Sequence, residues 1–224
     1  MDGKSRRLVY VWEWPVRFFH WTNFLCMLGL TLTGFIIGNP PALQSSAEAS
    51  FSYWFGWVRF IHFSLAYLFL CNLVFRVYWA LVGNAFARWN NFIPIRRQEW
   101  VEIWHAFKRY LILIPMPRVR TTGHNRLAGL SYLIVGLLMV LQVATGFGMY
   151  AAMSESWFPR LFAWIVPLFG GDMVVRQWHH LVMWVFILFT GVHVYLAYFN
   201  DNQEQEGLFS SIITGFKFVE RDRS

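Results

Sequence analysis

Two histidines, His179 and His193, lie fourteen residues apart in one long apolar segment. Fourteen residues of α-helix make almost four turns, so both imidazoles fall on one face, ~21 Å apart along the axis. Imidazole is a good axial ligand for haem iron. A membrane helix with a histidine near each end of one face would therefore serve two haems. His20 and His62, near the ends of two earlier apolar segments, are candidate partners.

The composition indicates a membrane protein. The chain has 224 residues, of which 57% are hydrophobic and 14% charged, and its mean hydropathy is +0.40. Soluble domains usually contain ~25% charged residues. Aromatic residues make up 20%, with 13 Trp, which suits interfacial belts and packing around a flat cofactor. The net charge of +7 is better explained by cytoplasmic loops than by nucleic-acid binding.

The cysteines exclude one kind of cofactor attachment. Cys26 and Cys71 both fall in apolar spans, which favours neither a disulfide framework nor a metal cluster. The sequence has no Cys-x-x-Cys-His, so covalent c-type haem is excluded. The basic N-terminal segment lacks an apolar core followed by a cleavage site, and we expect a cytoplasmic tail leading into the first span.

Four stretches reach the ~20 residues needed to cross a bilayer: 18–38, 60–83, 128–150 and 177–199. All eight prolines lie outside them, as expected of uninterrupted helices. The sequence therefore predicts an all-α membrane protein, one domain over residues 1–224, with a four-helix transmembrane bundle.

The loops predict the orientation. The middle loop is strongly basic, with only Glu99 and Glu102 opposing Arg88, Arg96, Arg97, Lys108, Arg109, Arg118, Arg120 and Arg126. The N-terminal tail is basic too, and the other two loops are balanced. The positive-inside rule then puts both termini and the middle loop in the cytoplasm.

Three shorter segments are predicted to lie at the membrane interfaces. An amphipathic surface helix is indicated by Trp100, Ile103, Trp104, Phe107 and Leu111. A similar helical stripe near the C-terminus consists of Leu208, Ile212, Phe216 and Val219. The apolar segment 157–169, broken by two prolines, is expected to cover the outer end of the bundle.

With this topology the four histidines pair by depth. His62 and His179 fall near the outer side, and His20 and His193 near the inner side. Two bis-histidine haems follow, and two axial imidazoles leave no open position for oxygen, so such sites transfer electrons. Any one of these residues alone could equally be an interfacial or hydrogen-bonded histidine. The matched depths of all four favour the haem interpretation.

The remaining histidines carry weaker signals. His180 points about 100° away from His179 and is interpreted as a neighbour. His105 lies on the surface-helix candidate. In Gly123-His124-Asn125, just before the third span, a protonatable imidazole and an amide would suit a quinone carbonyl. On the residues alone, a helix-entry turn is the simpler interpretation of that tripeptide.

Arg76 is the only charged residue inside the predicted spans. It follows His62 by fourteen residues, so it shares a helix face at the inner level. A buried arginine needs an anionic partner, which a haem propionate would supply. Snorkelling to the inner surface explains its position equally well. Glycines such as Gly136, Gly146 and Gly191 would admit a porphyrin, although close helix packing is the commoner reason for an intramembrane glycine.

Five blocks in order along the chain resemble the b-type cytochrome subunit of membrane-bound nickel–iron hydrogenases. The blocks are Arg17-Phe18-Phe19-His20-Trp21 with Thr33-Gly34, Arg59-Phe60-Ile61-His62-Phe63, Arg76-Val77-Tyr78-Trp79-Ala80 with Gly83-Asn84, Gly123-His124-Asn125, and Trp178-His179-His180 with Gly191-Val192-His193. Thr22 and Gln177 depart from the usual pattern, and neither is a proposed ligand. A wider group, with formate dehydrogenase gamma cytochromes and bacterial cytochrome b561, shares the histidine positions.

The resemblance implies a function that spacing alone does not. The chain would anchor the small iron–sulfur and large nickel–iron hydrogenase subunits on the outer face of the bacterial inner membrane. It would take electrons through two non-covalent b haems and reduce a membrane quinone near His124. The chain would thus be the quinone-reducing subunit without the hydrogen-activating site. The alternative is a stand-alone b561-type di-haem quinone oxidoreductase. A transporter is disfavoured because the spans hold little polar lining.

Overall fold

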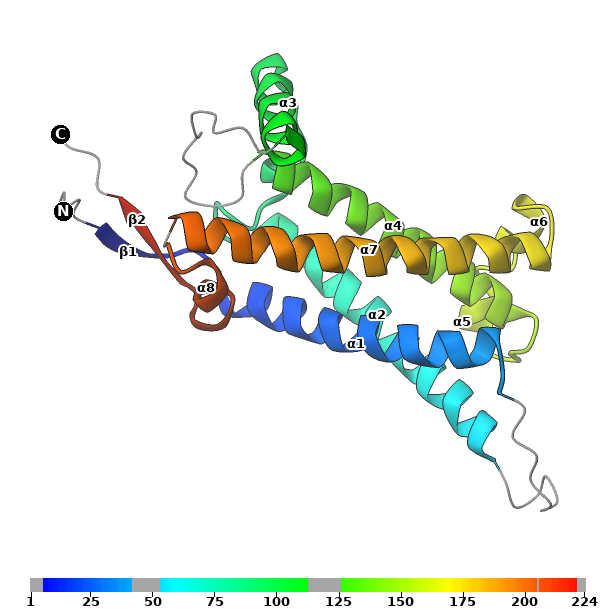
Figure 1. The fold of residues 1–224 in the computed structure, drawn as a ribbon. Coiled ribbons are helices and arrows are strands. Elements are labelled where there is room, and N and C mark those ends of the chain that lie inside the picture. Colours follow the sequence, from blue (N-terminus) through cyan, green and yellow to red (C-terminus); the bar gives the residue numbers. More distant parts are fainter. Residues whose placement is uncertain (1–5, 42–52, 113–125, 205, 221–224) are drawn as a thin grey trace. The chain divides into compact units, whose positions relative to one another are not determined.

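A computed structural model describes residues 6–41, 53–112, 126–204 and 206–220 (Figure 1). Its four longest helices are α1 (Trp14–Gly38), α2 (Trp54–Val82), α4 (Arg126–Ala151) and α7 (Asp172–Glu204). Each is long and apolar enough to cross a membrane. The four expected spans are therefore confirmed, and each helix begins earlier than the sequence pattern predicted.

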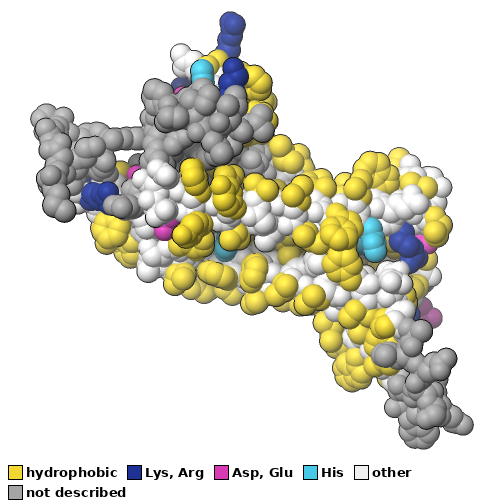
Figure 2. Space-filling model, viewed as in Figure 1, with side chains coloured by type: hydrophobic (Ala, Val, Ile, Leu, Met, Phe, Trp, Pro, Cys, Tyr) yellow, Lys and Arg dark blue, Asp and Glu magenta, His cyan; other side chains and the backbone are white. Residues whose placement is uncertain are grey.

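The helix limits and surfaces follow from the sequence. Pro15 falls in the first turn of α1, where a missing N–H costs nothing, and Pro40 and Pro41 follow the last residue of that helix. Large apolar side chains remain exposed along the helices, with Leu25 at 62% and Leu188 at 69%. Figure 2 shows hydrophobic side chains along the helices on the face in view. Such surfaces are suited to lipid, which is as apolar as leucine.

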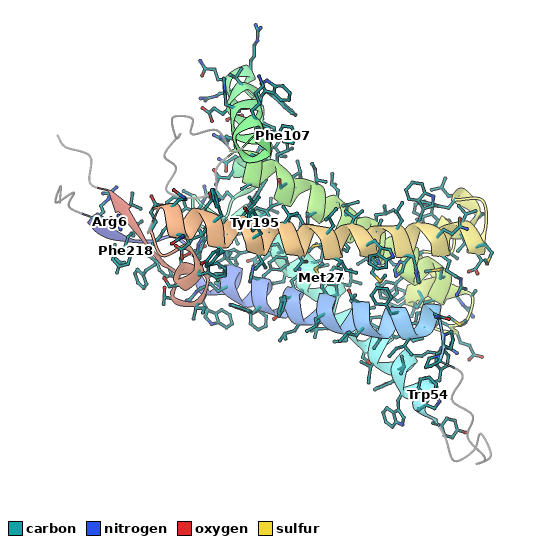
Figure 3. All side chains as sticks on the ribbon, in the orientation of Figure 1. Arg6, Met27, Trp54, Phe107, Tyr195 and Phe218 are labelled. Carbon is teal, nitrogen blue, oxygen red and sulfur yellow. The ribbon has the colours of Figure 1, made fainter. Side chains whose placement is uncertain are left out.

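Helix α3 (Arg97–Ile112) has the amphipathic pattern expected of a surface helix. Trp100, Trp104 and Phe107 are about half exposed, and Figure 3 shows Phe107 projecting from the helix. Lys108 Nζ lies 4.9 Å from the centroid of the Trp104 ring. The predicted helix is confirmed, and its location on the membrane surface stays a prediction.

Glu99 fixes the start of α3. The backbone N–H groups of Ile95 and Arg96 donate to Glu99 Oε2 over 2.8 Å and 3.0 Å, and Arg126 Nη2 lies 2.9 Å from Oε1. The Arg96 and Ile95 amides, together with the Arg126 charge, hold the pKa of Glu99 below its usual range. One carboxylate thus joins the first turns of α3 and α4.

The two ends of the described chain pair as a small sheet, which the sequence pattern did not predict. Strands β1 (Arg6–Tyr10) and β2 (Phe216–Glu220) are antiparallel, with Leu8 opposite Phe218. Figure 1 shows the strands side by side, with the short helix α8 (Leu208–Thr214) leading into β2, and Figure 3 labels Arg6 and Phe218 on the two strands. The predicted C-terminal helical stripe is therefore wrong beyond Thr214.

Gly215 explains why the helix stops there. Its φ of 90° is a left-handed conformation that favours glycine. A Cβ at this position would lie 2.7 Å from the Trp12 carbonyl oxygen and 2.6 Å from Tyr10 Cε2. The Gly215 carbonyl accepts hydrogen bonds from the backbone N–H groups of Val11 and Trp12. The reversal at Gly215 thus ends α8, and the residues that follow it pair with β1 as a strand.

The start of α1 is tied to the end of α2 by two polar side chains. Glu13 Oε2 accepts from Trp79 Nε1 over 3.0 Å and from the Asn84 backbone N–H over 2.8 Å. Asn84 Nδ2 donates to the Val11 carbonyl over 2.9 Å. Each such bond contributes about 1 kcal/mol, which gives the Gly83-Asn84 block a structural role.

Shorter helices complete the described chain. The 3₁₀ helix η2 (Trp89–Asn91) follows α2, and α5 (Trp157–Arg160) and α6 (Ile165–Leu168) lie between α4 and α7. The chain divides into two compact units, one of Met1–Arg17, Val77–Gln142 and His180–Ser224, and the other of Phe18–Arg76 and Val143–His179. The expected single domain stays a prediction.

Candidate functional site

His62 and Thr33 meet inside the second unit, between α2 and α1. His62 Nδ1 is 2.8 Å from Thr33 Oγ1, and the same hydroxyl is 2.7 Å from the Gly29 carbonyl oxygen. A carbonyl can only accept, so the single hydroxyl proton goes to Gly29, and Thr33 accepts from an N–H at His62 Nδ1. The lone pair of the neutral imidazole is then on Nε2, the nitrogen suited to a metal.

His179 repeats this arrangement between α7 and α4. His179 Nδ1 is 2.9 Å from the hydroxyl of Thr145, whose side chain is 1% exposed. The next residue, Gly146, presents bare backbone to the ring, because a Cβ there would lie 3.1 Å from His179 Cε1. The glycine therefore accommodates the imidazole of the neighbouring helix, as close helix packing through small residues requires, and the approach of a porphyrin stays a prediction.

Aromatic contacts bring His62 and His179 to the same stretch of α4. Phe63, next to His62, stacks on Tyr150 with ring centroids 4.3 Å apart, and Tyr150 is one helical turn beyond Gly146, against which the His179 ring lies. His179 itself and the residue next to His62 thus both meet α4 within residues 145–150, and the pairing of His62 with His179 stays a prediction.

The connection between α4 and α7 packs over this region. Phe158 lies 5.4 Å from Phe147 and 5.9 Å from Tyr67, measured between ring centroids. Ile165 is 5% exposed, and a Cβ at Gly148 would lie 3.1 Å from its Cβ. Segment 157–169 thus packs against the last turns of α4 and the middle of α2, and its position over the outer end of the bundle stays a prediction.

His20 and Arg76 lie elsewhere in the same unit. The Arg76 guanidinium is 5.8 Å from the centroid of the Phe19 ring, next to His20. Asn72, which is 4% exposed, donates from Nδ2 to the Phe19 carbonyl over 3.1 Å. Arg76 is half-buried. Arg76 therefore lies near the residue that precedes His20, and its contact with a haem propionate stays a prediction.

His193 belongs to the first unit and lies among aromatic rings. Its ring stacks on Phe189 with centroids 5.6 Å apart and meets Tyr132 of α4 edge-on at 6.0 Å. Gly136 lies one turn beyond Tyr132 on α4, and among the described residues of its unit no atom lies within 4 Å of a Cβ built there. His20 and His193 fall in different units, so their pairing stays a prediction.

The other predicted site residues are only partly described. Gly123, His124 and Asn125 lie outside the described residues. His105 is exposed on α3, and His180 is half-buried on α7. Sequence reasoning missed the hydroxyls of Thr33 and Thr145. Their polar character within apolar spans could have indicated them, because polar side chains in a membrane helix face the interior of the helix bundle or a functional group more often than lipid.

The donor set of the outer pair fits a haem. Two neutral imidazoles, each with Nδ1 at a threonine hydroxyl, would present Nε2 as the metal-binding nitrogen. Because a porphyrin supplies four nitrogen ligands itself, haem iron would need only these two further ligands from the protein. Non-covalent binding agrees with the absence of a Cys-x-x-Cys-His motif from the sequence.

Comparison with known proteins identifies similar chains. Residues 11–215 match the family model described as prokaryotic cytochrome b561. The chain is 39% identical to the probable Ni/Fe-hydrogenase B-type cytochrome subunit of Cupriavidus necator, covering 96% of this chain and 89% of that protein. The protein of the same name from Azotobacter vinelandii is 39% identical over 98% of this chain and 92% of its own length. The probable Ni/Fe-hydrogenase 1 B-type cytochrome subunit of Escherichia coli K12 is 35% identical, covering 97% and 94%.

Proposed function

Because the chain belongs to the prokaryotic cytochrome b561 family, we propose that it passes electrons from a nickel–iron hydrogenase to a membrane quinone. The structural observation that carries this proposal is the pair His62 and His179, each with Nδ1 at a buried threonine hydroxyl; His179 and Phe63, the neighbour of His62, both contact residues 145–150 of α4. The printed names of the relatives support the hydrogenase partnership.

Four histidines hold two b haems in this proposal. His62 and His179 would hold the outer haem, and His20 and His193 the inner one. Haem iron, when bound there, takes up and gives up single electrons. With an imidazole ligand from each histidine, the sites would carry electrons without bond chemistry at the metal. Arg76 would offer its half-buried charge to a propionate of the inner haem.

The orientation rests on the charge of the loops. The middle loop and the N-terminal segment hold most of the basic residues, so both termini face the cytoplasm of a bacterial inner membrane. The hydrogenase small and large subunits then bind the opposite, outer face, next to His62 and His179. The chain is their membrane anchor and the quinone-reducing part of the enzyme, while hydrogen is activated in the large subunit.

Gly123, His124 and Asn125 form the quinone site in this proposal. They precede α4 on the cytoplasmic side, where the His124 imidazole is able to give a proton to a reduced quinone oxygen. A stand-alone b561-type quinone oxidoreductase is the second candidate, favoured by the family match alone. Purification of the tagged chain separates the two, because only the first brings hydrogenase subunits with it.

Hydrogen-driven quinone reduction tests the function. In membranes that contain the whole complex, His124→Ala is expected to slow this reaction by about 10²-fold, a typical contribution of a general acid, with haem content unchanged. His105→Ala, on exposed α3, is the matched control and should leave the rate unchanged. An unchanged rate in His124→Ala would refute the quinone role, and no hydrogen-driven reduction by the wild-type complex would refute the proposed function.

A further inference from the structure

Each histidine of the outer pair is held from a neighbouring helix by a threonine hydroxyl. Thr33 of α1 bonds His62 of α2 over 2.8 Å, and Thr145 of α4 bonds His179 of α7 over 2.9 Å. Thr33 is 9% exposed and Thr145 is 1% exposed. Both bonds lie in the second unit, away from water, where an unsatisfied polar group would be costly.

The direction of these bonds is set by the helices that carry the threonines. Thr33 donates its proton to the Gly29 carbonyl at 2.7 Å, with the Leu30 carbonyl also near at 3.2 Å. A helical threonine commonly donates to a carbonyl one turn back, and Thr145 occupies such a helical position. The Thr33 hydroxyl oxygen is then an acceptor for the N–H at His62 Nδ1. A Thr145 hydroxyl that donates within α4 would accept from His179 Nδ1 in the same way.

The His179 ring lies against a glycine of α4. Gly146 adjoins Thr145 and brings its backbone close to His179 Cε1, so any Cβ there would meet the ring at 3.1 Å. The hydroxyl bond orients the imidazole, and the missing Cβ of Gly146 leaves the room that the ring occupies. An imidazole whose ring is already oriented loses little further rotational freedom when it binds iron, so the entropic cost of binding is smaller.

An acceptor at Nδ1 also changes the electronic character of the ligand. Donation of the Nδ1 proton into a hydrogen bond makes Nε2 more basic, as in other histidine metal ligands. A more basic imidazole favours oxidised over reduced iron, so it lowers the reduction potential. A lower potential at the outer haem favours the loss of its electron to the next carrier.

From these contacts we infer that Thr33 and Thr145 are positioning residues that lower the reduction potential of the outer haem. They act through the ligands His62 and His179 and do not touch the iron. The inference rests on the proposed function to the extent that it requires a haem between these two histidines.

Substitution by valine tests the inference, because valine keeps the shape of threonine and removes the hydroxyl. In the purified complex, Thr33→Val and Thr145→Val are each expected to raise the reduction potential of the outer haem. At a fixed applied potential, the ratio of reduced to oxidised iron in that haem should increase by up to about tenfold, which corresponds to ~59 mV for one electron. The low-spin signals of that haem in electron paramagnetic resonance should shift, and the other haem should not change. Redox titration and the spectra measure both effects.

Two further variants make the test specific. Thr190→Val is the matched control, since the Thr190 hydroxyl donates to the Phe186 carbonyl of its own helix over 2.8 Å, and the outer potential should be unchanged. Thr33→Ser keeps the hydroxyl and should retain the wild-type potential even if Thr33→Val loses haem. A serine variant that behaves like valine, or valine variants with unchanged potential and spectra, would overturn the inference. Wild-type protein without bis-histidine haem would instead overturn the proposed function.

Discussion

Replacement of His179 by alanine is expected to remove the outer haem and to leave the inner one bound. The haem content should fall from about two to about one per chain, because iron with one axial imidazole is held poorly in a site built for two. His179 is the residue whose imidazole meets both Thr145 and Gly146. Haem extraction and redox titration of the purified variant measure the loss and identify the haem that remains.

His180→Ala is the matched control for this variant. His180 adjoins His179 on α7 but points about 100° away, so both haems should remain. A His179→Ala protein that keeps both haems would show that His179 is not a ligand. Loss of the inner haem alone would reverse the assigned orientation of the chain.

Replacement of His193 by alanine is expected to remove the other haem and to stop electron delivery to quinone. The His193 ring contacts Phe189 and Tyr132, and a methyl group in place of the imidazole would offer no nitrogen to haem iron. The outer haem should still be reduced when hydrogen is supplied, while quinone reduction falls by about 10²-fold or more, as when an essential group is removed. Stopped-flow spectra of the haems, together with the quinone assay, separate these two steps.

The contrast between the two variants is the informative result. In His179→Ala, hydrogen should fail to reduce the inner haem, whereas in His193→Ala the outer haem should become reduced and remain so. Leu188→Ala, an exposed apolar position on α7, is a control for damage to the helix. If His193→Ala instead lost the outer haem, the depth-based pairing of the four histidines would be wrong.

Much of the fold was predictable because lipid imposes strict demands on sequence. Spans must be about 20 apolar residues long, and prolines interrupt them only at cost. The ranges 18–38, 60–83, 128–150 and 177–199 all lie in helices, with 83 the single exception, one residue past the end of α2. The earlier starts of α1 and α2 could not be predicted, because Trp14 and Trp54 resemble interfacial residues as much as helical ones.

The paired strands at the chain ends were missed for a physical reason. Leu208, Ile212, Phe216 and Val219 have helical spacing, but Gly215 in a left-handed conformation ends the helix before the last two. Pairing with β1 depends on contacts between residues about two hundred positions apart. A local pattern contains no information on such a partner.

The depths of the candidate histidines were predictable from the sequence, and their surroundings were not. Histidine depths follow from helix geometry, so His62 and His179 could be paired from spacing and topology alone. The contacts of Thr33 and Thr145 depend on which helices are neighbours and how they are rotated. Spacing along one helix does not determine that rotation, so the two hydroxyls became visible only in the structure.

Quantification of haem in the purified chain tests the central claim most directly. Protein purified with its partners should contain about two non-covalent b haems per chain, both low-spin with two imidazole ligands in electron paramagnetic resonance. Acid acetone should extract both, because the sequence has no site for covalent attachment. A chain that purifies folded with no haem, or with a single haem that survives in both His62→Ala and His179→Ala, would contradict the account.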